Sequence, residues 1–258
     1  DFAKLALEVR VADANRLVVG LDDAGAEMAL RGGPDWQDVL LYPTDFVRGD
    51  GTARLDWRGI GELSLHKTRR LEAGKGKPPV VLGTGDWKGE APEFRDLRWV
   101  PGTREELNAR RVVRLAEVTP VDGRTYLDIG CADVFTQGWG AAMDASCTGA
   151  PLAIGGRTYG KGIGTHAESE AIFFLGGRYR RFHADVGLQE GQPGSARFRV
   201  FLDDRQVFDS GVMRRGEGPK TVDIDLTGAM ELRLVADDGG DGRAGDHANW
   251  ADAYVSER

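Results

Sequence analysis

The sequence has few of the residues on which metal, redox and nucleic-acid sites are usually built. It holds two cysteines and four histidines among 258 residues, and no CxxC pair, so a zinc or redox centre is not indicated. Acidic residues outnumber basic ones and give a net charge of −7. No apolar run approaches the roughly 20 residues that cross a bilayer. We therefore expect no nucleic-acid partner, which would need a basic face, and no membrane insertion.

The two cysteines, Cys131 and Cys147, leave their redox state open. They are either two buried free thiols or one disulfide, which would stabilise the fold by roughly 3 kcal/mol in the chain-entropy model. The sequence begins at Asp1, without a methionine, and shows no signal peptide. We therefore expect a processed protein or an excised fragment.

Short hydrophobic runs punctuated by glycine dominate the rest of the sequence. Hydrophobic residues make up 41% of the chain, and 37 glycines separate runs rich in Val, Thr and aromatic residues. Apolar and polar residues alternate at residues 5–11, 198–202 and 222–226, which is the period of a half-buried strand. Turn signals at short intervals favour a sandwich or jelly roll. The sequence therefore predicts an all-β protein.

A charged stretch separates two β-rich parts. Thr103 is followed three residues later by Glu106, the spacing of a capping box, which predicts a short helix or linker here. The alternative is a long loop inside a single domain. We predict two β-sandwich domains of the jelly-roll type, at residues 1–100 and 117–258, joined by a linker at residues 101–116.

Two stretches that lie far apart in the sequence have similar chemistry. The first is Gly-Thr-His-Ala at residues 164–167, and the second is Asp-His-Ala-Asn-Trp-Ala-Asp at residues 246–252. Each holds a histidine among small residues, at or beside an expected strand. This composition is typical of a shallow polar recognition site or of a metal-bound loop. Each imidazole could instead tie a strand end to a backbone carbonyl.

Further short motifs accompany these two stretches in a fixed order. They lie at residues 125–127, 138–140, 159–167, 179–187, 207–211, 232–235 and 246–253. The set resembles the NPCBM family of carbohydrate-binding modules, also classed as carbohydrate-binding module family fifty-one. The resemblance implies a non-catalytic, galactose-binding-like jelly roll, often attached to secreted glycoside hydrolases. It also implies galactose-type sugars as ligands and, in many members, a structural Ca²⁺ ion.

The N-terminal part carries a shorter pattern. Residues 36–46 and 55–60 look like the jelly-roll modules of carbohydrate-binding family eleven and their relatives. This second resemblance implies a β-sandwich of the same broad kind. It does not identify a ligand.

A sugar site needs an aromatic ring for the C–H face of the sugar and polar groups for its hydroxyls. Trp139 lies between two glycines, which favours an accessible ring on a loop, although it could instead be buried at the end of the sandwich. His166 and His247 offer a donor and an acceptor each. The candidate carbohydrate-binding residues are therefore Trp139, His166, Glu168, His247, Asn249 and Trp250, the last of which could also belong to the core.

Carboxylates are dense near the C-terminus, and hard oxygen ligands suit calcium. The spacing does not fit an EF-hand. The resemblance implies Asp252, in the last strand, as a calcium ligand, and Asp241 is the second candidate; backbone carbonyls of residues 117–123 would complete the shell. The alternative is a solvated acidic turn.

We expect a non-catalytic carbohydrate-binding fragment of a secreted or cell-surface polysaccharide-processing protein, with galactosides as ligands. Two alternatives remain open at the level of sequence. The first is a small β-sandwich enzyme, since glycoside hydrolysis needs two carboxylates and acidic residues are plentiful. The second is a structural spacer without a sugar site, which a fully buried Trp139 would favour.

Overall fold

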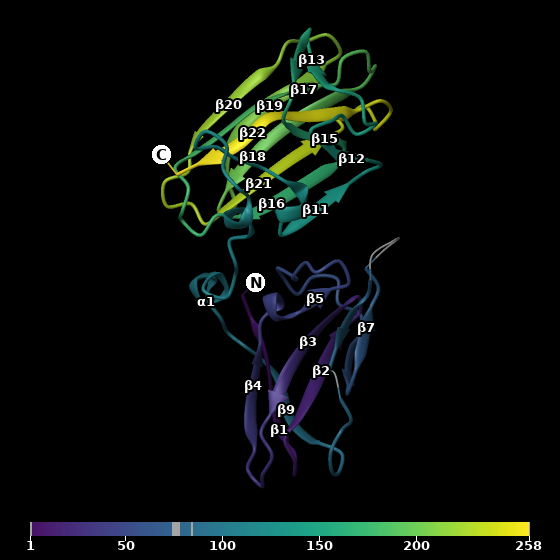
Figure 1. Cartoon of the computed structure of the whole chain (residues 1–258), viewed down its shortest axis with the longest axis vertical. Coiled ribbons are helices and arrows are strands. Elements are labelled where there is room, and N and C mark those ends of the chain that lie inside the picture. The colour runs from purple at the N-terminus through teal and green to yellow at the C-terminus, as the bar shows by residue number, and fades with distance from the viewer. Residues whose placement is uncertain (1, 74–77, 84, 258) are drawn as a thin grey trace. The chain divides into compact units, whose positions relative to one another are not determined.

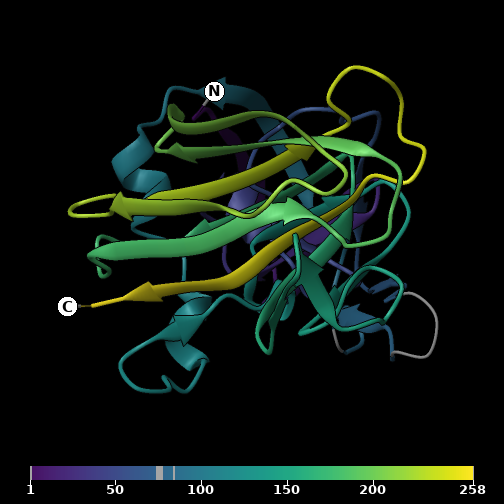
Figure 2. The ribbon, with the colours of Figure 1, turned by 90° about the horizontal axis from the view of Figure 1, so that it is seen from above.

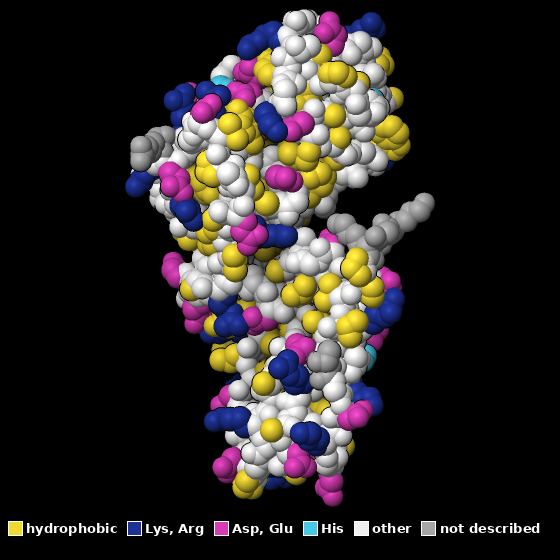
Figure 3. All heavy atoms as spheres, viewed as in Figure 1, with side chains coloured by type: hydrophobic (Ala, Val, Ile, Leu, Met, Phe, Trp, Pro, Cys, Tyr) yellow, Lys and Arg dark blue, Asp and Glu magenta, His cyan; other side chains and the backbone are white. Residues whose placement is uncertain are grey.

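The computed structural model describes residues 2–73, 78–83 and 85–257. The chain divides into two compact units, Asp1–Arg111 (unit 1) and Val112–Arg258 (unit 2), and both consist mainly of strands (Figure 1). The prediction of an all-β protein is confirmed. Within the described ranges, no helix has the length and apolar character needed to cross a membrane. Basic and acidic side chains are intermingled over the surface that Figure 3 shows.

Unit 1 packs two sheets around one hydrophobic core. The apolar side chains of the alternating pattern at residues 5–11 are buried in this core, together with Leu17, Val19, Leu21 and Phe46. The three-stranded sheet has the order β4 (Gln37–Leu41), β1 (Lys4–Arg10), β9 (Glu93–Val100). The four-stranded sheet has the order β5 (Val47–Arg48), β3 (Ala24–Leu30), β2 (Asn15–Leu21), β6 (Leu63–His66), and a separate hairpin joins β7 (Arg69–Leu71) to β8 (Val80–Leu82).

The capping box predicted at Thr103 is present. The hydroxyl of Thr103 accepts a hydrogen bond from the Glu106 amide at 3.1 Å, and the Glu106 carboxylate accepts one from the Thr103 amide at 3.0 Å. These bonds start helix α1 (Arg104–Asn108). Glu106 also forms an ion pair with Lys4 of β1 at 3.0 Å, and Leu107 is buried. The helix therefore packs as part of unit 1.

Unit 2 is a larger sandwich of two antiparallel sheets, whose long strands run alongside one another in Figure 2. The six-stranded sheet has the order β12 (Ala141–Met143), β15 (Gly162–His166), β22 (His247–Ser256), β17 (Arg181–Leu188), β20 (Lys220–Asp225), and β10 (Thr125–Tyr126) pairs with β22. The five-stranded sheet has the order β11 (Val134–Gln137), β16 (Ser169–Phe174), β21 (Glu231–Asp237), β18 (Ser195–Leu202), β19 (Arg205–Arg214).

Short elements connect these sheets. The 3₁₀ turns are η1 (Pro43–Asp45) in unit 1, and η2 (Arg114–Glu117) and η3 (Ile129–Cys131) in unit 2. A hairpin that turns at Gly155 and Gly156 joins β13 (Leu152–Ile154) to β14 (Arg157–Tyr159). Both glycines have positive φ, 52° and 82°, as the tight turn of such a hairpin requires.

Alternation of side chains positions the core of unit 2 and the outer face of its five-stranded sheet. On β18, Ala196, Phe198, Val200 and Leu202 are buried, whereas the residues between them point away from the core. The two cysteines are free thiols, which resolves the alternative that the sequence leaves open. Partial burial raises the pKa of both thiols, so neither is activated as a nucleophile at neutral pH.

Candidate functional site

The turn between β11 and β12 presents Trp139 to solvent. The Gly138 amide donates to the carbonyl of His166 at 3.4 Å, and the His166 amide donates to the carbonyl of Gly140 at 3.0 Å. A Cβ atom at Gly138 would lie 2.6 Å from the carbonyl oxygen of Ala167, so this close approach requires glycine. Trp139, held between these two contacts, is 65% exposed. The alternative of a buried Trp139 is wrong.

The two histidine motifs meet in space next to this turn. Strands β15 and β22 pair antiparallel with His166 opposite His247. The ring centroid of Trp139 lies 5.8 Å from that of His166 and 6.1 Å from that of His247, and the two imidazoles lie 5.4 Å apart. Trp139, His166 and His247 therefore form one aromatic cluster at the edge of the sandwich.

The polar atoms of the two imidazoles differ in their partners. Nδ1 of His166 lies 2.7 Å from the carbonyl oxygen of Ala167, and because a carbonyl only accepts, this nitrogen carries the proton. In the tautomer that carries its proton on Nδ1, Nε2 is the acceptor. Nδ1 of His247 is buried without a hydrogen-bond partner. His166 thus fixes a strand end, as the structural alternative expects, and both imidazoles are largely buried, with 9% of His166 and 8% of His247 exposed.

Burial lowers the pKa of His247, and the nearby His166 lowers it further. The unfolded chain therefore takes up a proton at His247 near pH 6.5, before the folded chain does. Stability contributed by the neutral ring is present above pH 6.5 and is lost as the pH falls toward the folded pKa. We expect His247→Gln to show a smaller drop in melting temperature between pH 7.5 and 5.5 than the unmodified protein. Identical drops would contradict this account.

The residues beneath the aromatic cluster do not reach the surface. Asp246 and Asn249 are fully buried. Asp246 accepts a hydrogen bond from the Ser195 amide at 2.9 Å, and burial raises the pKa of its carboxyl group. The Asn249 amide donates to Oε1 of Gln189 at 2.8 Å. Asn249 supports the site from below, so the sequence-based prediction that it contacts a sugar is corrected.

Trp250 also belongs to the interior. It is 3% exposed and packs edge-to-face against Phe198, with ring centroids 5.2 Å apart. The prediction of Trp250 as a sugar contact is wrong, because the ring has no face open to solvent. Glu168, by contrast, is exposed on the connection between β15 and β16, two residues after His166.

The two predicted metal ligands lie apart. Asp241 is engaged by the Ser195 hydroxyl at 2.7 Å and by Arg214 at 3.3 Å. Ser195 also contacts Asp246, and Asp252 lies six residues further along β22, roughly 20 Å for an extended strand. Within the part of the chain that the structure describes, no three His, Cys, Asp or Glu side chains gather as a metal site. Asp241 and Asp252 therefore cannot share one ion.

The surroundings of Asp252 leave its carboxylate available. Its side chain is 33% exposed, and its neighbours Arg124 and His183 lie at 3.9 and 3.8 Å, beyond hydrogen-bonding distance. The oxygens of Asp252 could serve a calcium ion only together with further ligands such as backbone carbonyls, since no three His, Cys, Asp or Glu side chains of the described residues gather there. The side chains of the described residues alone therefore do not form a calcium site at Asp252.

A polar face that is not among the sequence-based predictions lies beside the cluster. Glu170, Arg199 and Arg233 project from the outer face of the five-stranded sheet, where they line a groove of about 510 Å³ that also includes Glu168. The signal is present in the sequence, since charged residues alternate with core residues along β18 and β21. Alternation marks these side chains as outward-facing but does not reveal that they share a groove.

Unit 2 is thus a β-sandwich that exposes the Trp139 ring beside two buried imidazoles at its edge. The NPCBM/NEW2 domain family matches residues 124–256, about half of the chain. The chain therefore belongs to the NPCBM family of non-catalytic carbohydrate-binding modules, and the resemblance noted in the sequence is confirmed.

Two curated bacterial proteins share this region. A protein of Renibacterium salmoninarum described as an endo-alpha-N-acetylgalactosaminidase is 32% identical over 129 residues, which are 46% of this chain and 8% of that protein. Alpha-1,3-galactosidase B of Akkermansia muciniphila is 37% identical over 116 residues, 43% of this chain and 14% of that protein. The chain thus spans a small fraction of the length of either relative.

A similar solved structure is the family-51 carbohydrate-binding module from a family-95 glycoside hydrolase of Clostridium perfringens, in complex with methyl-galactose. It is 36% identical, with a TM-score of 0.47, and the match covers 48% of this chain and 94% of that chain.

Proposed function

We propose that unit 2 binds galactose-configured sugars at the aromatic cluster of Trp139, His166 and His247. The observation that carries this proposal is the exposed Trp139 ring held beside two imidazoles. The names of both curated relatives refer to galactose-type substrates, which supports the same sugar class. Since those relatives are glycan-degrading enzymes, we also propose that this chain is part of a secreted or cell-surface protein of that kind and keeps it near its substrate.

The chemistry of the cluster suits one face of a galactose ring. The axial 4-hydroxyl of galactose leaves a continuous C–H surface on the opposite face, which can pack against the indole. The hydroxyls at the rim of the sugar can then bond to the imidazole nitrogens, one of which is an acceptor at His166. A shallow site with one aromatic platform should bind weakly, with a Kd between millimolar and micromolar, or roughly −4 to −8 kcal/mol.

Titration calorimetry of the full chain tests this proposal. We expect methyl galactoside to bind in that range and methyl glucoside, its epimer at C4, to bind at least several-fold more weakly. The equatorial 4-hydroxyl of glucose interrupts the C–H surface and moves one hydroxyl away from the imidazoles. Equal affinity for the two epimers would overturn the galactose assignment, and binding of neither sugar would overturn the site.

We further propose Asp252 alone, and not Asp241, as the carboxylate ligand of a structural calcium ion. The proposal is supported by the partial exposure of Asp252 and by its distances of 3.9 Å to Arg124 and 3.8 Å to His183, which leave its oxygens beyond hydrogen-bonding distance of both. Both oxygens of Asp241, in contrast, already have hydrogen-bond partners. Backbone carbonyls of the loop at residues 117–123 would supply the remaining oxygens. The ion would stabilise unit 2 without taking part in sugar contacts.

Chelation should lower the melting temperature of the protein if calcium occupies this position. An ion present at 100 times its Kd adds about 2.7 kcal/mol, which corresponds to roughly 5–10 °C for a unit of this size. We expect calcium to restore the loss in the unmodified protein and in Asp241→Asn, but not in Asp252→Asn. A melting temperature that is the same with EDTA and with calcium would contradict the proposal.

A further inference from the structure

The groove beside the aromatic cluster is continuous with the Trp139 turn. One end of the groove is formed by Gly138, which precedes Trp139, and by Glu168, which follows the His166 motif. From there it crosses the outer face of the sheet over β16, β21 and β18. Three steps between neighbouring strands, from β11 to β18, amount to roughly 14 Å. The groove is therefore longer than a single sugar ring.

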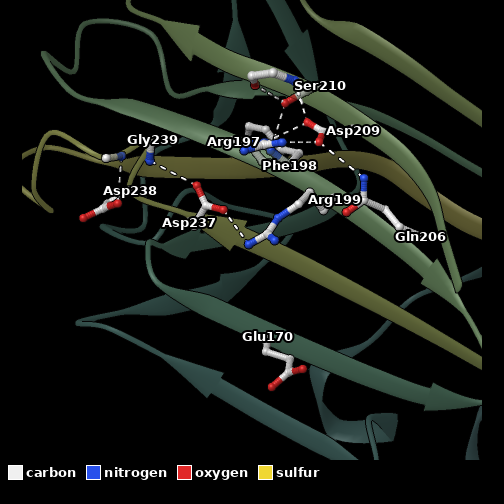
Figure 4. Close-up of polar contacts among 12 residues, drawn as sticks. Glu170, Arg197, Phe198, Arg199, Gln206, Asp209, Ser210, Asp237, Asp238 and Gly239 are labelled. Atoms are coloured by element: carbon white, nitrogen blue, oxygen red, sulfur yellow. Dashed lines mark hydrogen bonds and ion pairs between the residues drawn. The ribbon is translucent and has the colours of Figure 1, made fainter. Parts of the chain in front are cut away.

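Paired charges form the floor of this groove. Arg233 of β21 bonds to Glu170 of β16 at 3.2 Å, and Arg199 of β18 bonds to Asp237 of β21 at 2.6 Å. In Figure 4, Arg199 reaches across to Asp237, and Glu170 projects from a neighbouring strand of the same sheet. Each of the four side chains is between 23% and 35% exposed. They are held in place by their partners and remain open to a ligand.

The floor also provides apolar surface. The guanidinium carbon of Arg233 lies 3.9 Å from the ring centroid of Phe201, and Val235 lines the groove between the charged pairs. A guanidinium has five N–H donors and a carboxylate has about four acceptor positions, so each pair keeps capacity for further hydrogen bonds. The groove thus offers donors, acceptors and apolar side chains, which match the hydroxyls and C–H faces of a sugar chain.

The charges that line the groove balance. Three arginines face three carboxylates, namely Arg199, Arg233, Arg243, Glu168, Glu170 and Asp237. A polyanionic glycan would need an excess of positive charge, which is absent from this lining. The balance favours a neutral, polyhydroxylated ligand.

From these contacts we propose that the groove is an extended subsite, which binds the further sugars of a neutral glycan whose terminal galactose residue packs on Trp139. This inference rests on the proposed function and deepens it, because the module then recognises an oligosaccharide and not only its end. The continuity through Gly138 and Glu168 brings the chain from the terminal subsite onto the paired charges.

Affinity as a function of chain length tests the inference. The probes are methyl galactoside and neutral linear oligosaccharides of two to five sugars that end in galactose, with α-1,3, α-1,4, β-1,3 and β-1,4 linkages. We expect at least one linkage series to bind the full chain tenfold or more tightly than the monosaccharide. The double variant Glu170→Gln, Arg233→Gln removes both members of an ion pair without leaving one charge unpaired. It should lose most of this gain and keep the affinity for methyl galactoside.

Arg197 and Asp209 provide a matched control. They form an ion pair at 2.9 Å on the same outer face, shown in Figure 4, but do not line the groove. The double variant Arg197→Gln, Asp209→Asn should therefore keep the full gain with chain length.

The outcomes separate this inference from the proposed function. If methyl galactoside binds but no oligosaccharide binds more tightly, the extended subsite is wrong and the galactose site stands. If the Glu170→Gln, Arg233→Gln variant still binds oligosaccharides more tightly than methyl galactoside by the full factor, the extended subsite is likewise wrong and the galactose site stands. Tighter binding of sialylated or sulfated chains than of their neutral counterparts would overturn the assignment of a neutral ligand. If methyl galactoside itself does not bind, the proposed function fails first.

Discussion

Replacing Trp139 with alanine is expected to weaken the binding of methyl galactoside by about tenfold to a hundredfold. The indole supplies the apolar platform of the site, and loss of the burial of such a side chain against a ligand is worth roughly 1.5–3 kcal/mol. The melting temperature should not change, because the ring is 65% exposed and lies on a turn. Calorimetry and thermal unfolding measured on the same sample separate the two effects.

Trp99 offers a matched control for this substitution. It is 56% exposed but belongs to unit 1. Trp99→Ala should leave the Kd for methyl galactoside unchanged, and Trp139→Phe should retain part of the affinity because it keeps an aromatic face. If Trp139→Ala and Trp99→Ala had the same Kd, Trp139 would not be the sugar platform.

Replacing Trp250 with alanine is expected to lower the stability of the protein, in contrast to the loss of sugar affinity expected for Trp139→Ala. The side chain is 3% exposed and packs against Phe198 in the core of unit 2. Truncation of such a buried aromatic residue costs about 3–5 kcal/mol, a large part of the 5–15 kcal/mol by which folded proteins are typically stable. Urea unfolding should show a clear fall in the free energy of unfolding.

A milder substitution keeps the second prediction testable if the alanine variant does not fold. Trp250→Phe should reduce stability less and bind methyl galactoside with the Kd of the unmodified protein. A variant at Trp250 with normal stability and lost binding would show that this ring contacts the sugar, as the sequence alone had allowed.

The contrast between these two tryptophans shows what the sequence could predict. Glycines on both sides of Trp139 indicate a turn, and the accessible ring follows from it. Trp250 lies in β22, a central strand that is buried on both faces, so the period of two that marks inward and outward residues is lost. Local sequence therefore locates the exposed residue better than the buried one.

Contacts that depend on strand pairing could not be derived from the sequence. His166 and His247 lie 81 positions apart by their numbers, and only the register of β15 against β22 brings their rings together. The similarity of the two histidine motifs indicated a shared role, but it did not show that the two histidines are neighbours in the structure. The family resemblance, which rests on the order of many short motifs, supplied the fold that makes this pairing possible.

The closeness of acidic residues in the sequence also did not predict which carboxylates lie close together in the structure. Asp241 and Asp252 stand close in the chain, yet an extended strand separates them because each residue adds about 3.3 Å. The arginine and carboxylate residues of the groove, in contrast, lie far apart in the sequence and close together in the structure. Their residues come from β16, β18 and β21, and only the sheet order places Glu170, Arg233 and Arg199 side by side.

The most direct test of the central claim is a crystal structure of the full chain with methyl galactoside. We predict that the sugar ring packs on the exposed face of Trp139, with hydroxyls within hydrogen-bonding distance of His166 and His247. A sugar bound elsewhere on unit 2, with the aromatic cluster empty at a saturating concentration, would contradict the account.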